Sequence, residues 1–83
     1  MYYTYMVQSI EDRAYFYKGH CANIETRLRE HNSGKTKSNK HKAPFNLVYF
    51  EKSETREEAV IKEKYWKTAA GRRYLQKMVK LVT

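Results

Sequence analysis

Apolar and aromatic side chains gather in three short runs along the chain. Residues 2–8 and 14–19 are rich in tyrosine, and residues 45–51 contain Phe, Leu, Val and Tyr. Aromatic and β-branched residues favour extended strands. The polar residues 10–13 separate the first two runs, so we expect those two runs to pair as an antiparallel hairpin. The pattern therefore predicts three strands.

Capping signals mark where two helices begin. Asn23 is a favourable N-cap for a helix over residues 24–31. Thr55, followed by Glu58, forms the capping-box pattern at the start of a helix over residues 56–68. Both signals lie directly before segments that carry apolar residues at helical spacing, so each predicts a helix packed against the sheet.

A third helix is expected near the C-terminus. Gly71 should end the second helix, because glycine is unfavourable in a helix interior. Beyond it, apolar residues recur at the i, i+3, i+4, i+7 spacing of one helix face. They are Leu75, Met78, Val79 and Val82. With residues 32–44 as a polar loop, the order ββαβαα predicts one α+β domain over residues 1–83, in which helices flank a small three-stranded antiparallel sheet.

Length and composition narrow the class of protein. The chain has 83 residues, of which 41% are hydrophobic and 14% aromatic, so we expect a small globular domain. Its apolar runs are too short to span a membrane, and its first ten residues lack the features of a signal peptide. Cys21 is the only cysteine, which excludes an internal disulfide and indicates a reducing compartment. We therefore expect a cytoplasmic protein without membrane association.

Positive charge is unevenly distributed along the chain. Seventeen Lys and Arg outnumber nine Asp and Glu, for a formal net charge of +8. No acid occurs between Glu30 and Glu51 or after Glu63. The first of these stretches contains Lys35, Lys37, Lys40 and Lys42. Basic stretches are commonly solvated surface, but two of them in so short a chain favour contact with the phosphates of a nucleic acid.

Polar residues interrupt the apolar faces of the first two helices. Arg27 and His31 lie on the inward stripe of the first helix. An arginine whose stem covers the core and a histidine near the helix end would explain them without function. Glu63 lies beside the apolar stripe of the second helix. It is either an ion-pair partner of Lys62, Lys67 or Arg27, or a ligand for a hard divalent cation.

Tyrosines alternate along the two hairpin strands. Tyr3 and Tyr5 share one face of the first strand, and Tyr15 and Tyr17 share one face of the second. Such aromatic pairs commonly stabilise a sheet. A phenol can also transfer protons, provided that nearby positive charge lowers its pKa. The sequence leaves both roles open.

In combination, these residues resemble a known family. Tyr-Thr-Tyr at residues 3–5 and Tyr-Lys-Gly at residues 17–19 resemble the two short motifs of the GIY-YIG nuclease domain. Residues 23–32 are similar to its N-L-x-x-R-L-x-x-H-N helix, and residues 59–64 to its A-x-x-x-E-K segment. The resemblance extends over most of the chain, and it is to the small stand-alone kind of domain that is similar to the UvrC N-terminal catalytic domain.

The second motif raises two geometric expectations. Lys18 stands where the family usually has Ile, Val or Thr, and its side chain should point away from that of Tyr17. Tyr5 and Tyr17 can serve one site only if the residue numbers paired across the hairpin sum to an even value, for example with Tyr5 opposite Tyr17. An odd register would place the two phenols on opposite faces.

The resemblance implies metal-dependent hydrolysis of phosphodiester bonds in DNA, in repair or recombination. Tyr17 would accept the proton of the attacking water, directly or through a relay, and Tyr5 would help to orient the water or Tyr17. Arg27 would bind the scissile phosphate, and His31 would assist proton transfer or phosphate binding. Glu63 would hold one divalent cation, Mg²⁺ or Mn²⁺, whose other ligands are waters and a phosphate oxygen.

Further residues are expected at the DNA backbone. They are His20, Lys35, Lys37, Lys40, His41 and Lys42. Because the chain has room for a catalytic core only, we expect specificity to come from a homodimer, an additional specificity subunit or the loop at residues 32–44. The alternative to an enzyme is a non-catalytic nucleic-acid-binding module or repair-complex subunit that retains the nuclease fold.

Overall fold

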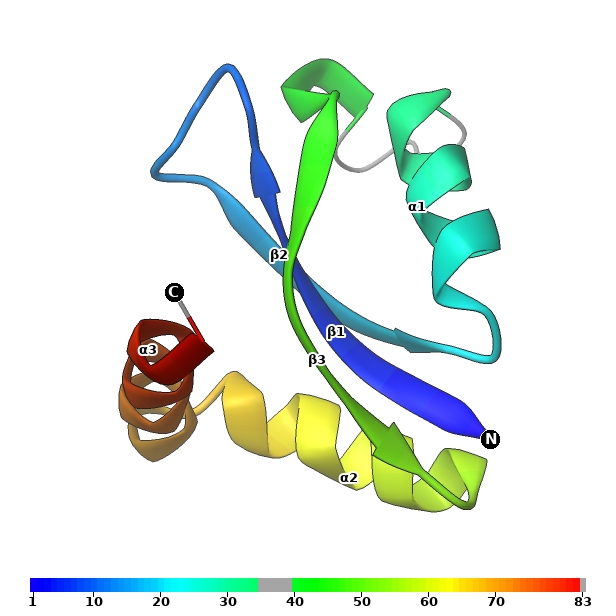
Figure 1. Ribbon diagram of the computed structural model, residues 1–83, viewed down its shortest axis with the longest axis vertical. Coiled ribbons are helices and arrows are strands. Elements are labelled where there is room, and N and C mark those ends of the chain that lie inside the picture. The colour runs from blue at the N-terminus through cyan, green and yellow to red at the C-terminus, as the bar shows by residue number, and fades with distance from the viewer. Residues whose placement is uncertain (35–39, 83) are drawn as a thin grey trace.

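A computed structural model describes residues 1–34 and 40–82 and has its elements in the predicted order (Figure 1). The strands are β1 (Tyr2–Ser9), β2 (Phe16–Cys21) and β3 (Phe45–Ser53), and the helices are α1 (Ile24–Asn32), α2 (Arg56–Trp66) and α3 (Ala69–Val82). The expected loop also contains a short 3₁₀ helix, η1 (Lys40–Lys42). The predicted α+β fold is confirmed. None of the described helices is long and apolar enough to cross a membrane.

Strand β1 lies at the centre of the sheet and has β2 and β3 as antiparallel neighbours. Helix α1 covers one face of the sheet, and α2 and α3 cover the other (Figure 1). Successive residues of β1 therefore enter different cores. Tyr5 and Val7 pack with Phe45 on the α1 side. Met6 packs with Trp66 and Leu75 on the side of α2 and α3, and burial of both faces explains why β1 is the most buried element.

Both predicted N-caps are present. The side chain of Asn23 accepts a hydrogen bond from the backbone N–H of Thr26 at 3.0 Å. At α2, the Thr55 hydroxyl accepts from the N–H of Glu58, and the Glu58 carboxylate accepts from the N–H of Thr55. These bonds satisfy N–H groups that the helix itself leaves unpaired, so the sequence signals determine where α1 and α2 begin.

The sequence predicted that Gly71 would end the second helix, and this prediction is wrong. Helix α2 ends at Trp66, and Gly71 lies in the first turn of α3, where its N–H donates to the Thr68 hydroxyl at 3.0 Å. A Cβ atom at Gly71 would lie only 1.8 Å from the carbonyl oxygen of Tyr65. The glycine is therefore required because α3 starts against the last turn of α2.

The hairpin has the predicted parity but a different pairing. Tyr5 lies opposite Gly19, and Tyr17 lies opposite Val7, so paired numbers sum to an even value. This pairing differs by two residues from the example of an even register in which Tyr5 lies opposite Tyr17. The connection is longer than residues 10–13, because β1 ends at Ser9 and β2 begins only at Phe16. The backbone N–H of Ser9 donates to the carbonyl oxygen of Tyr15 at 3.0 Å.

Candidate active site

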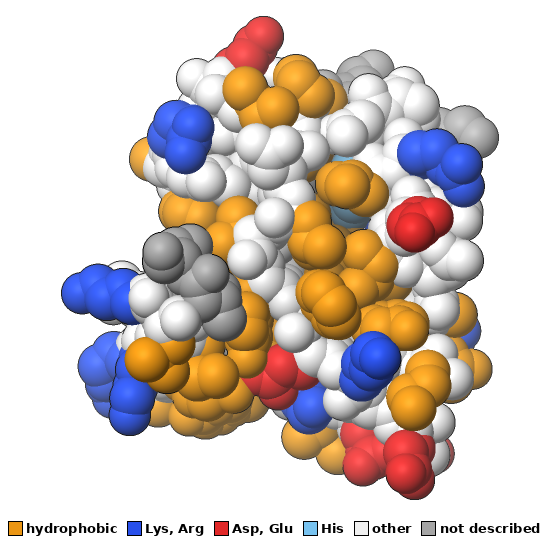
Figure 2. Space-filling view, in the orientation of Figure 1, with side chains coloured by type: hydrophobic (Ala, Val, Ile, Leu, Met, Phe, Trp, Pro, Cys, Tyr) orange, Lys and Arg blue, Asp and Glu red, His pale blue; other side chains and the backbone are white. Residues whose placement is uncertain are grey.

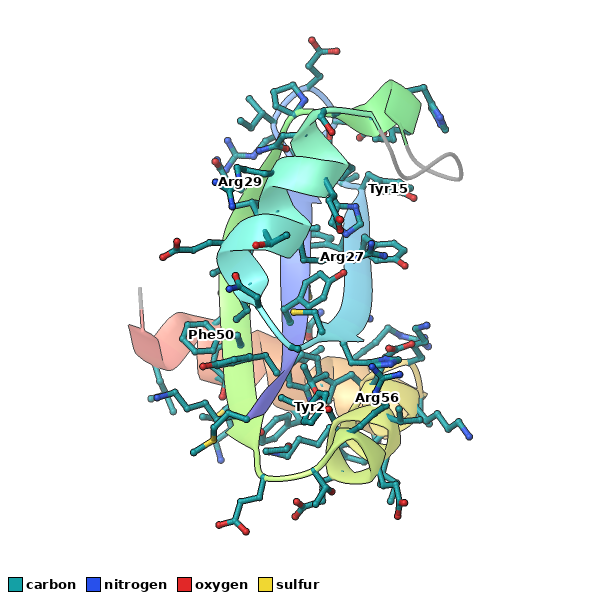
Figure 3. The ribbon with its side chains drawn as sticks, turned by 90° about the vertical axis from the view of Figure 1, so that its right-hand side faces the viewer. Tyr2, Tyr15, Arg27, Arg29, Phe50 and Arg56 are labelled. Atoms are coloured by element: carbon teal, nitrogen blue, oxygen red, sulfur yellow. The ribbon has the colours of Figure 1, made fainter. Side chains whose placement is uncertain are left out.

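Four of the predicted site residues form one cluster between the sheet and α1. The Tyr5 hydroxyl accepts a hydrogen bond from Nε of Arg27 at 3.3 Å and lies 2.9 Å from Nε2 of His31. The Tyr17 ring stands edge-on to the His31 ring, with 5.0 Å between centroids, and lies 6.4 Å from the Tyr5 ring. In Figure 3, Arg27 lies beside α1, over the strands of the sheet. We call Tyr5, Tyr17, Arg27 and His31 the α1-side cluster.

Gly19 makes room for the α1-side cluster. A Cβ atom at this position would lie 2.7 Å from the Tyr5 hydroxyl oxygen and 3.2 Å from a ring carbon of Tyr17. Both phenol rings therefore occupy the space that a side chain at residue 19 would fill. Sequence reasoning treated Gly19 only as part of a motif. The signal that could have found its role is the even register, which places residue 19 on the same face as the two tyrosines.

The cluster combines a neutral phenol with a charged guanidinium. Burial raises the pKa of Tyr5 to about 12, although the hydrogen bond and charge of Arg27 act in the opposite direction. The hydrogen bond with Tyr5 is the main cause of a raised pKa for Arg27. On its more exposed side, Arg27 donates from Nη1 to Glu30 at 3.2 Å. At neutral pH, Tyr5 thus keeps its proton and Arg27 keeps its charge.

Glu63 lies toward the other face of the sheet. Its Oε1 accepts a hydrogen bond from Nδ1 of His20, and its Oε2 accepts from Nζ of Lys67, both at 2.7 Å. Thr4, which pairs with His20 across the hairpin, bonds through its hydroxyl to the Ala59 carbonyl of α2, so both side chains of this pair face α2. These contacts therefore join Glu63 to β2 through His20.

Of the ion-pair partners that the sequence offered for Glu63, the structure selects Lys67. Lys62 lies 3.4 Å from Glu51 instead, and Arg27 pairs with Glu30. Within the described residues, no hydrogen bond or ion pair joins Glu63 directly to the α1-side cluster. The structure thus brings four predicted residues together on one face of β2 and places Glu63, with His20, toward the opposite face.

The surroundings of Glu63 bear on whether it can hold a metal ion. Burial acts to raise its pKa, but the hydrogen bonds from Lys67 and His20 outweigh burial, and the pKa lies below its ordinary value. Glu63 is therefore a carboxylate at neutral pH. No group of three His, Cys, Asp or Glu side chains suited to a metal occurs in the described part of the chain. A Mg²⁺ or Mn²⁺ ion that keeps most of its waters needs only one carboxylate, and at Glu63 it would replace one of the hydrogen bonds from His20 and Lys67.

The basic loop is described only in part. Lys35 and Lys37 lie outside the described residues, and Lys40 is described only by its place in η1. His41 is exposed. Lys42 donates to the carboxylate of Asp12 at 2.7 Å. This ion pair holds Lys42 at the hairpin connection and offsets the charge that it could offer to a phosphate.

Comparisons with known proteins agree with this arrangement. Residues 1–77 match the family profile described as the GIY-YIG catalytic domain. The chain is also 35% identical over 63 residues to a UPF0213 protein of Haloquadratum walsbyi, an alignment that covers 75% of this chain and 68% of the relative. The matched residues include both tyrosine motifs, all of α1 and Glu63. The chain therefore belongs to the GIY-YIG family of catalytic domains, a family of nucleases.

Proposed function

We propose that this protein is a metal-dependent endonuclease that hydrolyses phosphodiester bonds in DNA. The observation that carries the proposal is the α1-side cluster, in which the guanidinium of Arg27 contacts one phenol beside a second. Phosphodiester hydrolysis requires positive charge at the phosphate and a group that receives a proton from water. The cluster offers both between α1 and one face of the sheet.

Arg27 is suited to bind the scissile phosphate. A guanidinium has five N–H donors, and the bonds to Tyr5 and Glu30 use one donor each on Nε and Nη1. Arg27 and Glu30 are each about one-third exposed, at 34% and 38%, so their ion pair is solvated and weak. A phosphate can therefore replace Glu30 at small cost, while the bond to Tyr5 keeps the guanidinium in place.

The two tyrosines differ in access to solvent, and this difference supports different roles. Tyr5 is buried, with 2% of its surface exposed, whereas Tyr17 is partly exposed. Tyr17, in its phenolate form, is therefore the group that would receive the proton of the attacking water, which returns it to the neutral phenol. Tyr5 accepts from Arg27 and can donate its own proton to Nε2 of His31. Because His31 is fully buried, it positions the two phenols and does not touch the phosphate.

Glu63 would hold one Mg²⁺ or Mn²⁺, with His20 beside it. When bound, the ion would supply positive charge to the phosphate and the leaving oxygen. Glu63 and Tyr17 lie toward opposite faces of β2, so a DNA strand reaches both only by crossing the outer edge of this strand. That edge carries no further strand among the described residues, because the sheet ends at β2.

Cleavage of nicked, branched and plain duplex DNA in the presence of Mg²⁺ or Mn²⁺ tests this proposal. We expect Tyr17→Phe and Glu63→Ala to abolish cleavage without unfolding the protein, and chelation of the metal to do the same. The matched controls are Tyr15→Phe, which changes a tyrosine outside the cluster, and Glu57→Ala, which removes an exposed carboxylate of α2. A preference for nicked or branched DNA would support a role in repair or recombination.

Two results would contradict the proposed function or the proposed site. Binding to all three DNAs without cleavage, with either metal, would contradict the proposal and favour a non-catalytic nucleic-acid-binding module. Cleavage that survives both Tyr17→Phe and Glu63→Ala would contradict the assignment of the site.

A further inference from the structure

A groove that the proposed chemistry does not use lies between the sheet and α3, on the face opposite the α1-side cluster. Its volume is about 540 Å³, which lies within the range of small-ligand sites. Its apolar lining comprises Met6, Val48, Leu75 and Val79. Lys and Arg side chains gather on the outer side of α3 beside it (Figure 2). The groove therefore offers an apolar surface in a positively charged part of the molecule.

The groove accounts for Lys18, the residue that departs from the family pattern. As expected, Lys18 points away from Tyr17, and it lines the groove together with Arg72 and Lys80. Burial lowers the pKa of Lys18, and the positive charges of Arg72 and Lys67 lower it further. None of the described residues that line the groove is acidic. The groove thus complements a ligand that joins an anionic group to an apolar body.

We propose that this groove binds an unpaired nucleotide of a DNA strand. A nucleotide joins a flat base, which stacks on aromatic and apolar side chains, to a phosphate that pairs with cations. Phe16 lines the groove two residues before Lys18 on the same face of β2, and 44% of its surface is exposed. The base packs against Phe16 and the apolar lining, and the phosphate contacts Lys18 and Arg72.

Two further side chains suit this ligand. Arg72 donates from Nη1 to the carbonyl oxygen of Lys67 at 3.0 Å, which fixes its guanidinium beside the end of α2 while leaving other donors for a phosphate. Gln76 lines the groove and carries both a donor and an acceptor for the edge of a base. An acidic peptide would use the cations but would leave the exposed face of Phe16 without a stacking partner.

The position of the groove links it to the candidate active site. Phe16 and Lys18 flank Tyr17 in β2, with their side chains on the opposite face. A DNA strand held at Tyr17 therefore has only to pass around the outer edge of β2 to place a nearby nucleotide in the groove. Such a nucleotide is available at a branch, flap or overhang and is absent from an intact duplex. The inference rests on the proposed function in taking DNA as the partner, and it adds unpaired DNA as the preferred substrate class.

Binding without divalent cations separates the groove from catalysis. We would measure fluorescence anisotropy of a labelled duplex with and without a short single-stranded overhang, in the presence of a chelator. Phe16→Leu should weaken binding of the overhang DNA about five-fold or more and leave binding of the plain duplex unchanged. Phe50→Leu is the matched control, because Phe50 is 42% exposed on β3 and does not line the groove.

The salt dependence tests the phosphate contact. Lys18→Gln should reduce the slope of log K against log salt concentration by about 0.7 for the overhang DNA, as expected for the loss of one single-strand phosphate contact. Lys77→Gln, an exposed position of α3 outside the groove, should change the overhang and plain duplexes equally. A structural role for Lys18 would not produce a slope change confined to one of the two DNAs.

The outcomes separate this inference from the proposed nuclease activity. If Glu63-dependent cleavage occurs but Phe16→Leu and Lys18→Gln behave like their controls, the groove proposal is wrong and the nuclease proposal stands. If the groove variants lose overhang binding while no DNA is cleaved, the groove proposal stands and the nuclease proposal is wrong. Competition by polyglutamate as effective as that by an oligonucleotide of similar charge would overturn the groove proposal in favour of an acidic protein partner.

Discussion

The two faces of the sheet each carry a pair of tyrosines, but the charge beside the pair differs in sign. On the α1 side, the Tyr5 hydroxyl accepts a hydrogen bond from the guanidinium of Arg27. On the side of α2 and α3, the hydroxyls of Tyr49 and Tyr74 both donate to Oε2 of Glu51. We call Tyr49, Tyr74 and Glu51 the Glu51 cluster. The same residue type thus meets a cation on one face and an anion on the other.

Under the proposed function, this difference in charge favours Tyr5 and Tyr17 over Tyr49 and Tyr74 as the tyrosines of the active site. The bond to Glu51 is the main cause of the raised pKa of Tyr74, and it adds to the effect of burial at Tyr49. Because Tyr49 and Tyr74 donate to a carboxylate, they keep their protons, and the bond from Tyr74 to Glu51 links α3 to β3. Arg27, in contrast, favours the phenolate form of the tyrosine it contacts, although burial still keeps Tyr5 neutral. A cation bonded to one phenol, beside a second phenol that is partly exposed, is therefore the feature that distinguishes the candidate site from the structural contact at Glu51.

Removal of the cation on the α1 side should have the largest effect. Arg27→Gln is expected to reduce the cleavage rate about 10²–10³-fold, because a positioned donor to the charge that develops at the phosphate is lost. Initial rates at saturating metal would measure the loss, and circular dichroism would confirm the fold. The matched change beside the Glu51 cluster is Lys62→Gln, which should leave the rate unchanged. Equal losses in both variants would show that overall positive charge matters rather than the position of Arg27.

The raised pKa of Tyr5 should appear in the stability of the protein at high pH. Its pKa is 10.0 in the unfolded chain and about 12 in the folded protein, so the folded state binds more protons between these values. Stability from this group is therefore complete below pH 10 and falls by about 2–3 kcal/mol as pH rises to 12. Urea denaturation across this range would measure the fall.

Tyr5→Phe isolates the contribution of Tyr5, because Tyr49 and Tyr74 also have raised pKa values and destabilise the fold in the same direction at high pH. The difference in unfolding free energy between wild type and Tyr5→Phe should depend on pH only above about 10. A difference that stays constant up to pH 12 would contradict the raised pKa of Tyr5.

Loss of a phenol from the Glu51 cluster should affect stability and not cleavage. Tyr74→Phe is expected to lower the free energy of unfolding by about 1–2 kcal/mol, since it removes a hydrogen bond to a charged group while Tyr49 and Lys62 still contact Glu51. Urea denaturation measures the stability change, and the cleavage assay serves as the control. Loss of cleavage in a folded Tyr74→Phe protein would show that the two faces are not independent.

The features that the sequence predicted well depend on neighbouring residues. The N-caps of Asn23 and Thr55 follow from side chains within a few positions of one another, whereas the even register of the hairpin was expected only as a requirement for Tyr5 and Tyr17 to share a site. Gly71 was misread because its role depends on contact with Tyr65 in the preceding helix, which no local propensity encodes. The pairing of Tyr5 depends on the length of the hairpin connection, which the polarity of residues 10–13 did not determine.

The candidate site shows the same division. Helical spacing predicted that Arg27 and His31 would share one side of α1. Alternation predicted that Tyr5 and Tyr17 would share one face only in an even register, and the hairpin has that register. The partner of Glu63 was not predictable, because each competing cation had its own alternative carboxylate elsewhere in the fold. The groove around Lys18 could not be inferred either, since it exists only where α3 packs beside the sheet.

The smallest expected effect comes from the carboxylate that shares Arg27. Glu30→Gln removes the ion pair at 3.2 Å and leaves Arg27 with Tyr5, so a phosphate no longer competes with Glu30. Because solvated pairs contribute at most about 1 kcal/mol, DNA affinity should rise by no more than about five-fold. The gain should shrink with added salt, which screens exposed charges. Glu25→Gln changes an exposed carboxylate on the same helix that makes no ion pair with Arg27 among the described residues. A gain of the same size in Glu25→Gln would mean that net charge, and not the release of Arg27, determines the affinity.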